Sequence, residues 1–469
     1  MDVRQKVKLK ENLNNQLAGF KSKAKGSNAI FAKLKAKIFT KSNSSSQNAA
    51  TEDSNSGRQI ISALDIGTEY VKALVAEVEG DNINVIGVSK KHQNLTDMYA
   101  GAIADIAGVV DNCEAALAEA ENMAGQGVSK SVLGIAGELV RGITYTITYR
   151  RADSEAQITA GEMQLVIEKA QAQSKLKAAR QLAEETGEDD IDVKLINSAI
   201  VAMYVDGYKI SNPIGFQGAK LSIRLYSAFA PMVHIGALQQ VATQLDLDLM
   251  AIAAEPFAVS RTVIGTDPSS AVSAILIDVG GGTTDIAFVE DGGVQGTRSF
   301  GIGGRSFTKA IAEDLGISFT KAEELKLNLS SENYSPQQRA VATKALQKTT
   351  EVWLAGIELC ISEFVEEQGE KYGALPSIIM LCGGGSSLAM LPQVLNSNEE
   401  WSKDLPFTHK PRVGLIKADA AKGITDLTEK VSDHTFITAL GLLRVGQDTM
   451  ISAEPESKLK ESFKKVLRT

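Results

Sequence analysis

Two short stretches of this chain place an aspartate at the end of an apolar run and follow it with glycine and threonine. They read DIGT at residues 65–68 and DVGGGTTD at residues 278–285. Glycine lets backbone N–H groups converge on a bulky anion, and threonine adds a hydroxyl donor. An aspartate beside such a turn is well placed to hold Mg²⁺ through water, because Mg²⁺ keeps several waters and takes few carboxylates. The two stretches together predict a clamp for a polyphosphate and its metal.

A third glycine-rich turn follows another apolar run, in MLCGGGSSLAMLP at residues 380–392. Any one such turn is more often a simple tight turn than a phosphate loop. Three of them, two with the aspartate-glycine-threonine chemistry, favour phosphate binding. The chain has neither the GxxxxGK[ST] loop of the P-loop proteins nor a GxGxxG dinucleotide fingerprint opening a helix.

The elements that must position these turns are repeated along the chain. QIISALDIGTEYVKALVAEVEG (59–80) and AVSAILIDVGGGTTDIAFVEDGG (271–293) both read as strand, turn, strand and acidic-glycine turn. The copies are too far apart for a solenoid repeat, which indicates two related halves that face each other. Helical periodicity alternates with strand-like runs between them, and this alternation predicts α/β layers.

Composition excludes several other classes of protein. The formal net charge of −8 argues against a nucleic-acid-binding role for the folded body. The three cysteines are far apart and odd in number, which favours a reducing compartment over a disulfide framework or zinc site. The four histidines are scattered, so we interpret them as surface or satisfied side chains. No apolar run reaches the roughly 18 residues of a membrane-spanning helix.

The motifs resemble those of the actin-like ATPase superfamily and, within it, the FtsA-type bacterial cell-division proteins. LDIGTEYVKALVAE and LIDVGGGTTDIAFVEDG resemble the two phosphate motifs, and IMLCGGGSSLAMLPQVL resembles the adenosine motif. AAEPFAVS (253–260) and TFITALGLL (435–443) resemble the two connecting motifs. The resemblance runs from about residue 58 to 446. It implies an α/β, actin-like (ribonuclease H-like) two-lobed ATPase fold with a small inserted domain of the FtsA type.

The resemblance also implies a division of the chain into domains. The stretches NMAGQGVSKSVLGIAGELVRG and DGYKISNPIGFQGAKLSIRLYSAFAP look like the small FtsA domain, which actin and the chaperones lack at this position. The expected parts are a basic arm and Ser/Asn-rich linker (1–57), a first lobe (58–96, 213–268 and 420–450), the inserted domain (97–212), a second lobe with the adenosine motif (269–419), and a linker with a C-terminal amphipathic helix (451–469).

Carried over to this sequence, the resemblance assigns catalytic and metal roles to three acids. Asp65 and Asp278 match the acids that position the hydration shell of Mg²⁺, and Glu255 matches the residue that orients the attacking water. Glu255 has the alternative role of capping a helix before Pro256. The residues expected to bind ATP are Gly67, Thr68, Lys72, Gly280, Gly281, Gly282, Thr283, Thr284, Gly303, Gly304, Glu323, Lys326, Gly383, Gly384, Gly385 and Ser386.

Three of these nucleotide-binding candidates have ordinary structural alternatives. Lys72 matches a phosphate-contacting lysine of some relatives, but it could equally be a solvated lysine on a strand. Glu323 and Lys326 match residues that hold ribose and adenine. They are also spaced as an i,i+3 surface ion pair on a helix.

Both ends of the chain carry basic, partly apolar segments. At the C-terminus, Leu459, Phe463, Val466 and Leu467 recur at helical spacing among lysines and an arginine. This pattern suits a helix lying in an anionic membrane interface, although a frayed ordinary helix has the same spacing. FtsA-type proteins end in such a membrane-targeting helix. Residues 1–41 hold eleven lysines and arginines against two acids, which favours either a second membrane contact or a polybasic tail that meets a protein or nucleic acid.

Taken together, the resemblance implies a cell-division protein that binds ATP and Mg²⁺ and self-associates into filaments. Its expected partners are FtsZ, other division proteins and the anionic membrane surface, at the cytoplasmic face of the division site. ATP is expected to act as an assembly switch with slow hydrolysis at most. The nearest alternative is a platform of type IV pilus assembly similar to PilM. A metabolic kinase or chaperone is disfavoured because the sequence contains no substrate-specific motif or separate peptide-binding domain.

Overall fold

The computed structural model describes residues 58–188, 191–265, 271–369 and 373–453 of the 469-residue chain, with side chains through residue 450. The basic arm and linker predicted for residues 1–57 lie outside the described residues. So do the predicted membrane-contacting residues Leu459, Phe463, Val466 and Leu467. None of the helices in the described part of the chain has the length and apolar character needed to cross a membrane.

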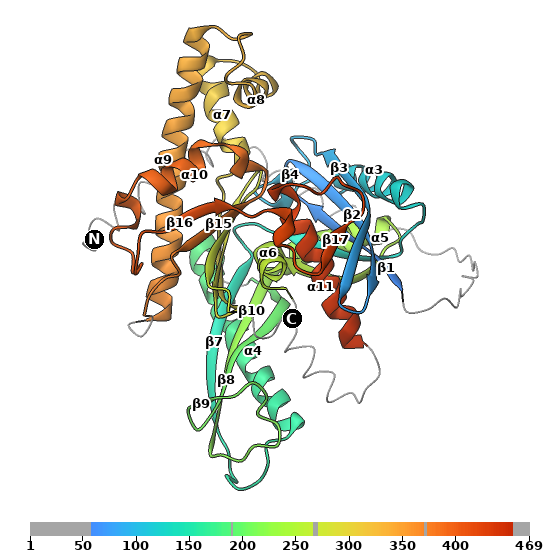
Figure 1. Ribbon diagram of the computed structural model, residues 1–469, viewed down its shortest axis with the longest axis vertical. Helices are drawn as coiled ribbons and strands as arrows, with labels where there is room; N and C mark the ends of the chain where they lie inside the picture. The colour runs from blue at the N-terminus through green and yellow to red at the C-terminus, as the bar shows by residue number, and fades with distance from the viewer. Residues whose placement is uncertain (1–57, 189–190, 266–270, 370–372, 454–469) are drawn as a thin grey trace. The chain divides into compact units, whose positions relative to one another are not determined.

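The first sheet is built around the strand that ends on the DIGT turn (Figure 1). Its order is β11-β6-β1-β2-β3-β17, in which β1, β2 and β3 form an antiparallel meander and β6 and β11 join in parallel. Parallel pairing requires a crossover, and helix α3 supplies it by packing on β2 and β3. The bounds are β1 Gln59–Ile66, β2 Tyr70–Glu79, β3 Asn82–His92, α3 Ile106–Ala124, β6 Lys130–Ile135, β11 Asp248–Ala254 and β17 Ile424–Asp426, with a short pair β4 Met98–Tyr99 and β5 Ala102–Ile103.

The second sheet repeats this plan around the strand that ends on DVGGGTTD. Its order is β14-β13-β12-β15-β16, again an antiparallel meander followed by two parallel strands. β12, β13, β14, β15 and β16 thus occupy the places of β1, β2, β3, β6 and β11. The predicted duplication is confirmed in the topology. The bounds are β12 Ala274–Val279, β13 Thr284–Glu290, β14 Gly293–Phe300, β15 Ile378–Cys382 and β16 Arg412–Leu415.

Two helices from the connecting motifs lie between the sheets. Helix α11 packs against the first sheet, α6 packs against the second, and the two helices pack against each other. Proline in the first turn of α6 needs no hydrogen-bond partner there and favours the helix start at Glu255. Further helices contact the second sheet, where α7 packs beside the long α9 (Figure 1). The bounds are α5 Met232–Gln244, α6 Glu255–Ile264, α7 Gly304–Leu315, α8 Phe319–Leu327, α9 Pro336–Gln368, α10 Met390–Ser397 and α11 Ile437–Ala453, with 3₁₀ turns at Gly384–Ser387, Glu400–Ser402, Ala418–Ala420 and His434–Phe436.

A separate antiparallel sheet, in the order β7-β10-β8-β9, carries helix α4 on one face. Met163 and Val166 of the helix are fully buried against strand residues such as Leu221, so this unit has an apolar core of its own. The Thr159 side chain caps the start of α4 by accepting a hydrogen bond from the backbone N–H of Glu162. The bounds are β7 Arg141–Arg150, α4 Ala160–Thr186, β8 Val193–Val205, β9 Tyr208–Lys209 and β10 Lys220–Pro231.

The limits of this unit differ from the predicted insertion at residues 97–212. Residues 106–135 form α3 and β6, and β6 pairs in parallel with β1 inside the first sheet. Strand β10, expected in the first lobe, instead lies between β7 and β8. The inserted unit therefore extends from Arg141 to Pro231. The inserted unit begins later than predicted because α3 and β6 complete the strand–helix–strand crossover of the first sheet.

Candidate functional site

The two aspartate-glycine turns meet face to face. A Cβ added at Gly281 would lie 2.7 Å from the Cβ of Glu69, and one added at Gly282 would lie 2.6 Å from Thr68 Oγ1. Real Cβ atoms essentially never approach so closely, so only glycine permits this contact between the turns. The extra glycines of the second turn thus allow the two halves to approach each other.

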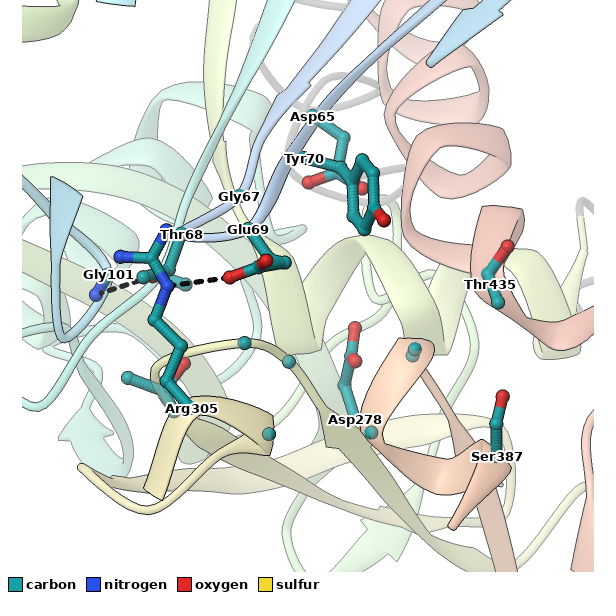
Figure 2. Close-up of a pocket in the computed structure, with 18 of the residues that line it drawn as sticks. Asp65, Gly67, Thr68, Glu69, Tyr70, Gly101, Asp278, Arg305, Ser387 and Thr435 are labelled. Carbon is teal, nitrogen blue, oxygen red and sulfur yellow. Dashed lines mark hydrogen bonds and ion pairs between the residues drawn. The ribbon is translucent and has the colours of Figure 1, made fainter. Parts of the chain in front are cut away.

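A cavity of about 430 Å³ opens beside this contact, and both sheets contribute to its walls (Figure 2). This volume falls in the range of small-molecule sites. The structure brings most of the predicted site residues to the cavity. Those that line it are Asp65, Gly67, Thr68, Lys72, Glu255, Asp278, Gly280, Gly281, Thr283, Gly304, Glu323, Lys326, Gly383, Gly384 and Gly385.

Four predicted nucleotide-binding residues do not line the cavity. Thr284 is fully buried, donates to the carbonyl of Ile302 at 2.7 Å and accepts from the indole of Trp353 at 3.0 Å, so its hydroxyl is already engaged. Ser386 is buried and donates to the carbonyl of Cys382. The remaining two, Gly282 and Gly303, serve close packing between the turns. Thr284 is the first residue of β13, and the alternation of side chains along a strand directs its hydroxyl away from the turn. The prediction treated all residues of the motif as facing the phosphate and so did not account for this alternation.

Asp278 is buried near the end of β12 and is held by a hydrogen bond from helix α11. The hydroxyl of Thr438, in the first turn of α11, donates to Asp278 Oδ2 at 2.5 Å. Burial raises the pKa of Asp278, and the Thr438 hydrogen bond opposes that rise. The glycine after β15 is also required here, because a Cβ on Gly383 would lie 2.0 Å from Asp278 Oδ1.

Asp65 occupies the corresponding place at the end of β1 but has a different partner. Lys72 lies directly opposite it on β2, and Lys72 Nζ donates to Asp65 Oδ2 at 2.7 Å. Burial alone would lower the pKa of Lys72, but the attraction of Asp65 outweighs it and the pKa is raised. Lys72 is therefore an ion-paired group on the cavity wall with only 13% of its side chain exposed, and the alternative of a solvated strand lysine is wrong.

Two further carboxyls complete an acidic cluster around these aspartates. Glu255 opens α6, and burial, then Asp65, Asp285 and Asp278, raise its pKa well above the ordinary value. Ala254 is the residue that precedes the helix and no side chain caps it, so the capping alternative for Glu255 is not supported. Asp285 accepts from the hydroxyls of Thr283 at 2.8 Å and Ser299. Burial raises the pKa of Asp285 to about 6.

Helices α7 and α8 form another part of the cavity wall. Lys326 Nζ lies 2.8 Å from Glu323 Oε2, and it donates to Thr308 Oγ1 at 2.8 Å and to the carbonyl of Gly304 at 3.1 Å. The i,i+3 ion pair of the alternative interpretation is thus present. This ion pair also lines the cavity, and only 11% of the Lys326 side chain is exposed. It is therefore part of the cavity wall and not a surface ion pair.

Sequence reasoning missed several residues of the cavity wall. Glu69 and Tyr70 lie within the first motif, and Arg305 directly follows the Gly303–Gly304 pair, so proximity to the motifs was a usable signal. Lys90 lies on β3, far from any motif, and reaches the cavity only because β3 pairs with β2. Thr435 belongs to the second connecting motif.

The donor set fits Mg²⁺ bound mainly through water. No group of three or more acidic, histidine or cysteine side chains in the described ranges is arranged to coordinate a metal directly. Asp65 and Asp278 provide the one or two carboxylates that Mg²⁺ accepts while retaining waters. Among the described residues the cavity wall holds six carboxyl groups against four cationic side chains. A polyphosphate therefore needs a cation between itself and this wall.

Duplicated sheets, facing aspartate-glycine turns and paired connecting helices define the actin-like, ribonuclease H-like ATPase fold, as predicted. In agreement, a solved chain of a PilM–PilN type IV pilus biogenesis complex matches with a TM-score of 0.56 and 17% identity, covering 84% of this chain and 99% of that one. The inserted unit at residues 141–231 is an addition to the two duplicated sheets.

Sequence comparison identifies the particular relatives. The family model described as cell division protein FtsA matches residues 275–453. Cell division protein FtsA of Neisseria meningitidis serogroup B is 24% identical over 403 residues, which cover 82% of this chain and 90% of that protein. FtsA of Bacillus subtilis is 25% identical over 356 residues, covering 72% and 77%. The chain is similar to FtsA over most of its length, and the resemblance predicted from the motifs is confirmed.

Proposed function

We propose that this chain is an FtsA-like cell-division protein that binds Mg-ATP in the cavity between its duplicated sheets. The observation that carries the proposal is the meeting of the two aspartate-glycine turns at one cavity, with Asp65 and Asp278 at the ends of equivalent strands. Such a clamp is suited to a polyphosphate and its metal.

The residues of the cavity divide between the parts of the proposed ligand. Asp65 and Asp278 would hold the waters of Mg²⁺, which supplies positive charge to the phosphates when bound. The backbone N–H groups of the two turns would face phosphate oxygens. Glu323 and Lys326 line the end of the cavity expected for ribose and adenine. The glycines after β15, Gly383–Gly385, would let the backbone lie flat against the base.

Hydrolysis, if it occurs, would depend on Glu255. Its carboxyl lines the cavity at the start of α6, where a water could be oriented toward a terminal phosphate. The raised pKa of Glu255, caused by burial among acids, disfavours the carboxylate form. We therefore infer slow turnover, with ATP acting mainly as a conformational and assembly switch. Glu255→Ala should lower hydrolysis while sparing ATP binding, and intact turnover in this variant would exclude the role.

The second part of the proposal is a membrane tether for FtsZ filaments at the cytoplasmic face of the division site. It is supported by the similarity to FtsA and by the amphipathic spacing of Leu459, Phe463, Val466 and Leu467. The segment that carries these residues follows α11, whose first turn contacts the candidate metal site through Thr438. Self-association into filaments belongs to the same proposal.

Co-sedimentation with FtsZ filaments and anionic vesicles tests this function. The intact chain should bring FtsZ to vesicles in the presence of ATP, and removal of residues 457–469 should release it from lipid while preserving FtsZ binding. Continued sedimentation of the truncated chain with lipid would assign the anchor to the N-terminal arm instead. Loss of FtsZ binding together with capture of a pilus-assembly peptide would favour a PilM-like platform.

A further inference from the structure

Most of the cationic side chains on the cavity wall are already committed to carboxylates. Among the described residues, four cations line the cavity, and three of them form ion pairs. These pairs are Lys72 with Asp65 at 2.7 Å, Arg305 with Glu69 at 2.6 Å, and Lys326 with Glu323 at 2.8 Å.

Lys90 is the fourth cation and differs from the others. No carboxylate in the described part of the chain forms an ion pair with it, and its ammonium lies 4.2 Å from the centre of the Tyr70 ring. The Tyr70 and His92 rings pack in a T-shaped arrangement with their centres 5.2 Å apart, so the aromatic support is itself held in place. A cation over an aromatic face is positioned without being neutralised, and it remains able to meet an anion.

The sheet register strengthens this observation. Asp65, Lys72 and Lys90 lie directly opposite one another on β1, β2 and β3, and their side chains therefore share one face. Two lysines in direct cross-strand positions repel each other. Asp65 neutralises Lys72, whereas Lys90 has only the more distant attraction of Asp433 and Asp65. Burial and the charge of Lys72 lower the pKa of Lys90, so a bound anion would relieve an unfavourable arrangement.

The geometry points to Lys90, supported on Tyr70, as the cavity's receiving site for a phosphate group of the bound nucleotide. This inference rests on the proposed function, because it takes a nucleotide as the ligand. It assigns the charge-recognition role to Lys90 instead of to Lys72, whose charge Asp65 already balances. Lys90 lines the cavity and is partly exposed to solvent, so its ammonium is accessible to a ligand.

The test compares the binding of ATP, ADP, AMP and adenosine, with Mg²⁺, to Lys90→Gln, Lys90→Arg and the unaltered chain. The matched control is Lys91→Gln, since Lys91 is the next residue on β3 and pairs with Glu119 on helix α3. We expect Lys90→Gln to weaken ATP binding about tenfold and adenosine binding less than twofold, a selectivity typical of a charge contact. Lys90→Arg should retain ATP binding, and Lys91→Gln should match the unaltered chain.

Each outcome distinguishes this inference from the proposed function. If the unaltered chain binds none of the four ligands, the proposed function itself fails. If the unaltered chain binds ATP and Lys90→Gln binds it equally well, Lys90 has no receiving role. Equal losses for ATP and adenosine would also overturn the inference, because they would indicate that Lys90 acts only by packing on Tyr70. A far-ultraviolet spectrum and unfolding temperature equal to those of the unaltered chain establish that each variant is folded.

Discussion

Arg305 donates from Nε to Glu69 Oε2 at 2.6 Å and so joins the start of α7 to the turn between β1 and β2 (Figure 2). Glu69 belongs to the half that contains the first sheet, and Arg305 belongs to the half that contains the second sheet. The same guanidinium also donates from Nη1 to the carbonyls of Leu95 and Met98. The ion pair therefore links the two walls of the cavity directly.

Breaking this ion pair should speed the release of bound nucleotide. The pair is largely buried, and a hydrogen bond between charged groups contributes about 1.5 to 3 kcal/mol, so Glu69→Gln should accelerate release by roughly tenfold or more. Stopped-flow dissociation of a fluorescent ATP analogue measures this rate. The exposed pair Lys348–Asp314 provides the control, and Asp314→Asn should leave the rate unchanged. An unaltered rate in Glu69→Gln would show that the pair does not restrain opening.

The hydrogen bond from Thr438 to Asp278 should set the magnesium requirement of the site. Thr438→Val preserves the shape of the buried side chain and removes its hydroxyl, so Asp278 loses the donor that orients it. We expect the Mg²⁺ concentration at half-maximal ATP binding to rise about tenfold, and Thr438→Ser to restore it. Thr449→Val is the matched control, because that hydroxyl only returns to its own helix at Val445. A magnesium titration identical to that of the unaltered chain would contradict the role.

Asp285 should make the ligand-free protein less stable as the pH rises. Its pKa is about 6 when folded, against an ordinary value of 3.8, so the folded protein binds this proton more tightly than the unfolded chain. The protonated carboxyl therefore contributes stability that is fully present below the pKa of 3.8 of the unfolded chain. This stability is lost as the pH rises through the folded pKa of about 6. Asp285→Asn cannot ionise and so removes this pH-dependent loss of stability. A shift of about two pKa units corresponds to a loss on the order of 3 kcal/mol.

Thermal unfolding at pH 5 and pH 8 tests the prediction for Asp285. The stabilisation of Asp285→Asn over the unaltered chain should be larger at pH 8 than at pH 5. Asp291→Asn, on an exposed turn after β13, should show no such difference. If Asp285→Asn is more stable than the unaltered chain by the same amount at pH 5 and at pH 8, the Asp285 carboxyl does not titrate between these pH values.

Gly383 should tolerate no side chain, whereas the next residue should. Gly383 has a φ of +79°, and an added Cβ would meet Asp278 Oδ1 at 2.0 Å, so Gly383→Ala must displace either the turn or the aspartate. We expect it to cost a few kcal/mol in the free energy of unfolding and to abolish nucleotide binding. An added Cβ on Gly384 meets nothing within 4 Å, and Gly384→Ala should change stability by less than about 0.5 kcal/mol. Equal unfolding free energies for the two variants, measured in urea, would refute the steric argument.

The sequence predicted the duplicated sheets and most of the cavity wall because local patterns encode them. A strand that ends on aspartate and is followed by glycines indicates both its local structure and its chemistry within a few consecutive residues. Both copies of this pattern could be recognised in the sequence. Asp65, Asp278 and the glycines of the first two turns were therefore predictable. Long-range pairing was not predictable in the same way.

Strand order accounts for what the sequence did not reveal. The pairing of β6 with β1 moved residues 106–135 from the expected insertion into the first sheet, because periodicity identifies a strand without identifying its neighbour. Lys90 reaches the cavity only through the register of β3 against β2. Thr284 shows the opposite error, since strand alternation turns its hydroxyl toward Trp353 and away from the turn that contains it.

The two facing turns are proposed to bind a nucleotide together with Mg²⁺. Calorimetric titration of ATP in the presence of Mg²⁺ into the unaltered chain and into Asp278→Ala tests it most directly. We expect saturable binding at one site per chain for the unaltered protein and no measurable heat for the variant, with both proteins folded. ATP affinity unchanged by Asp278→Ala, or absent from the unaltered chain, would contradict it.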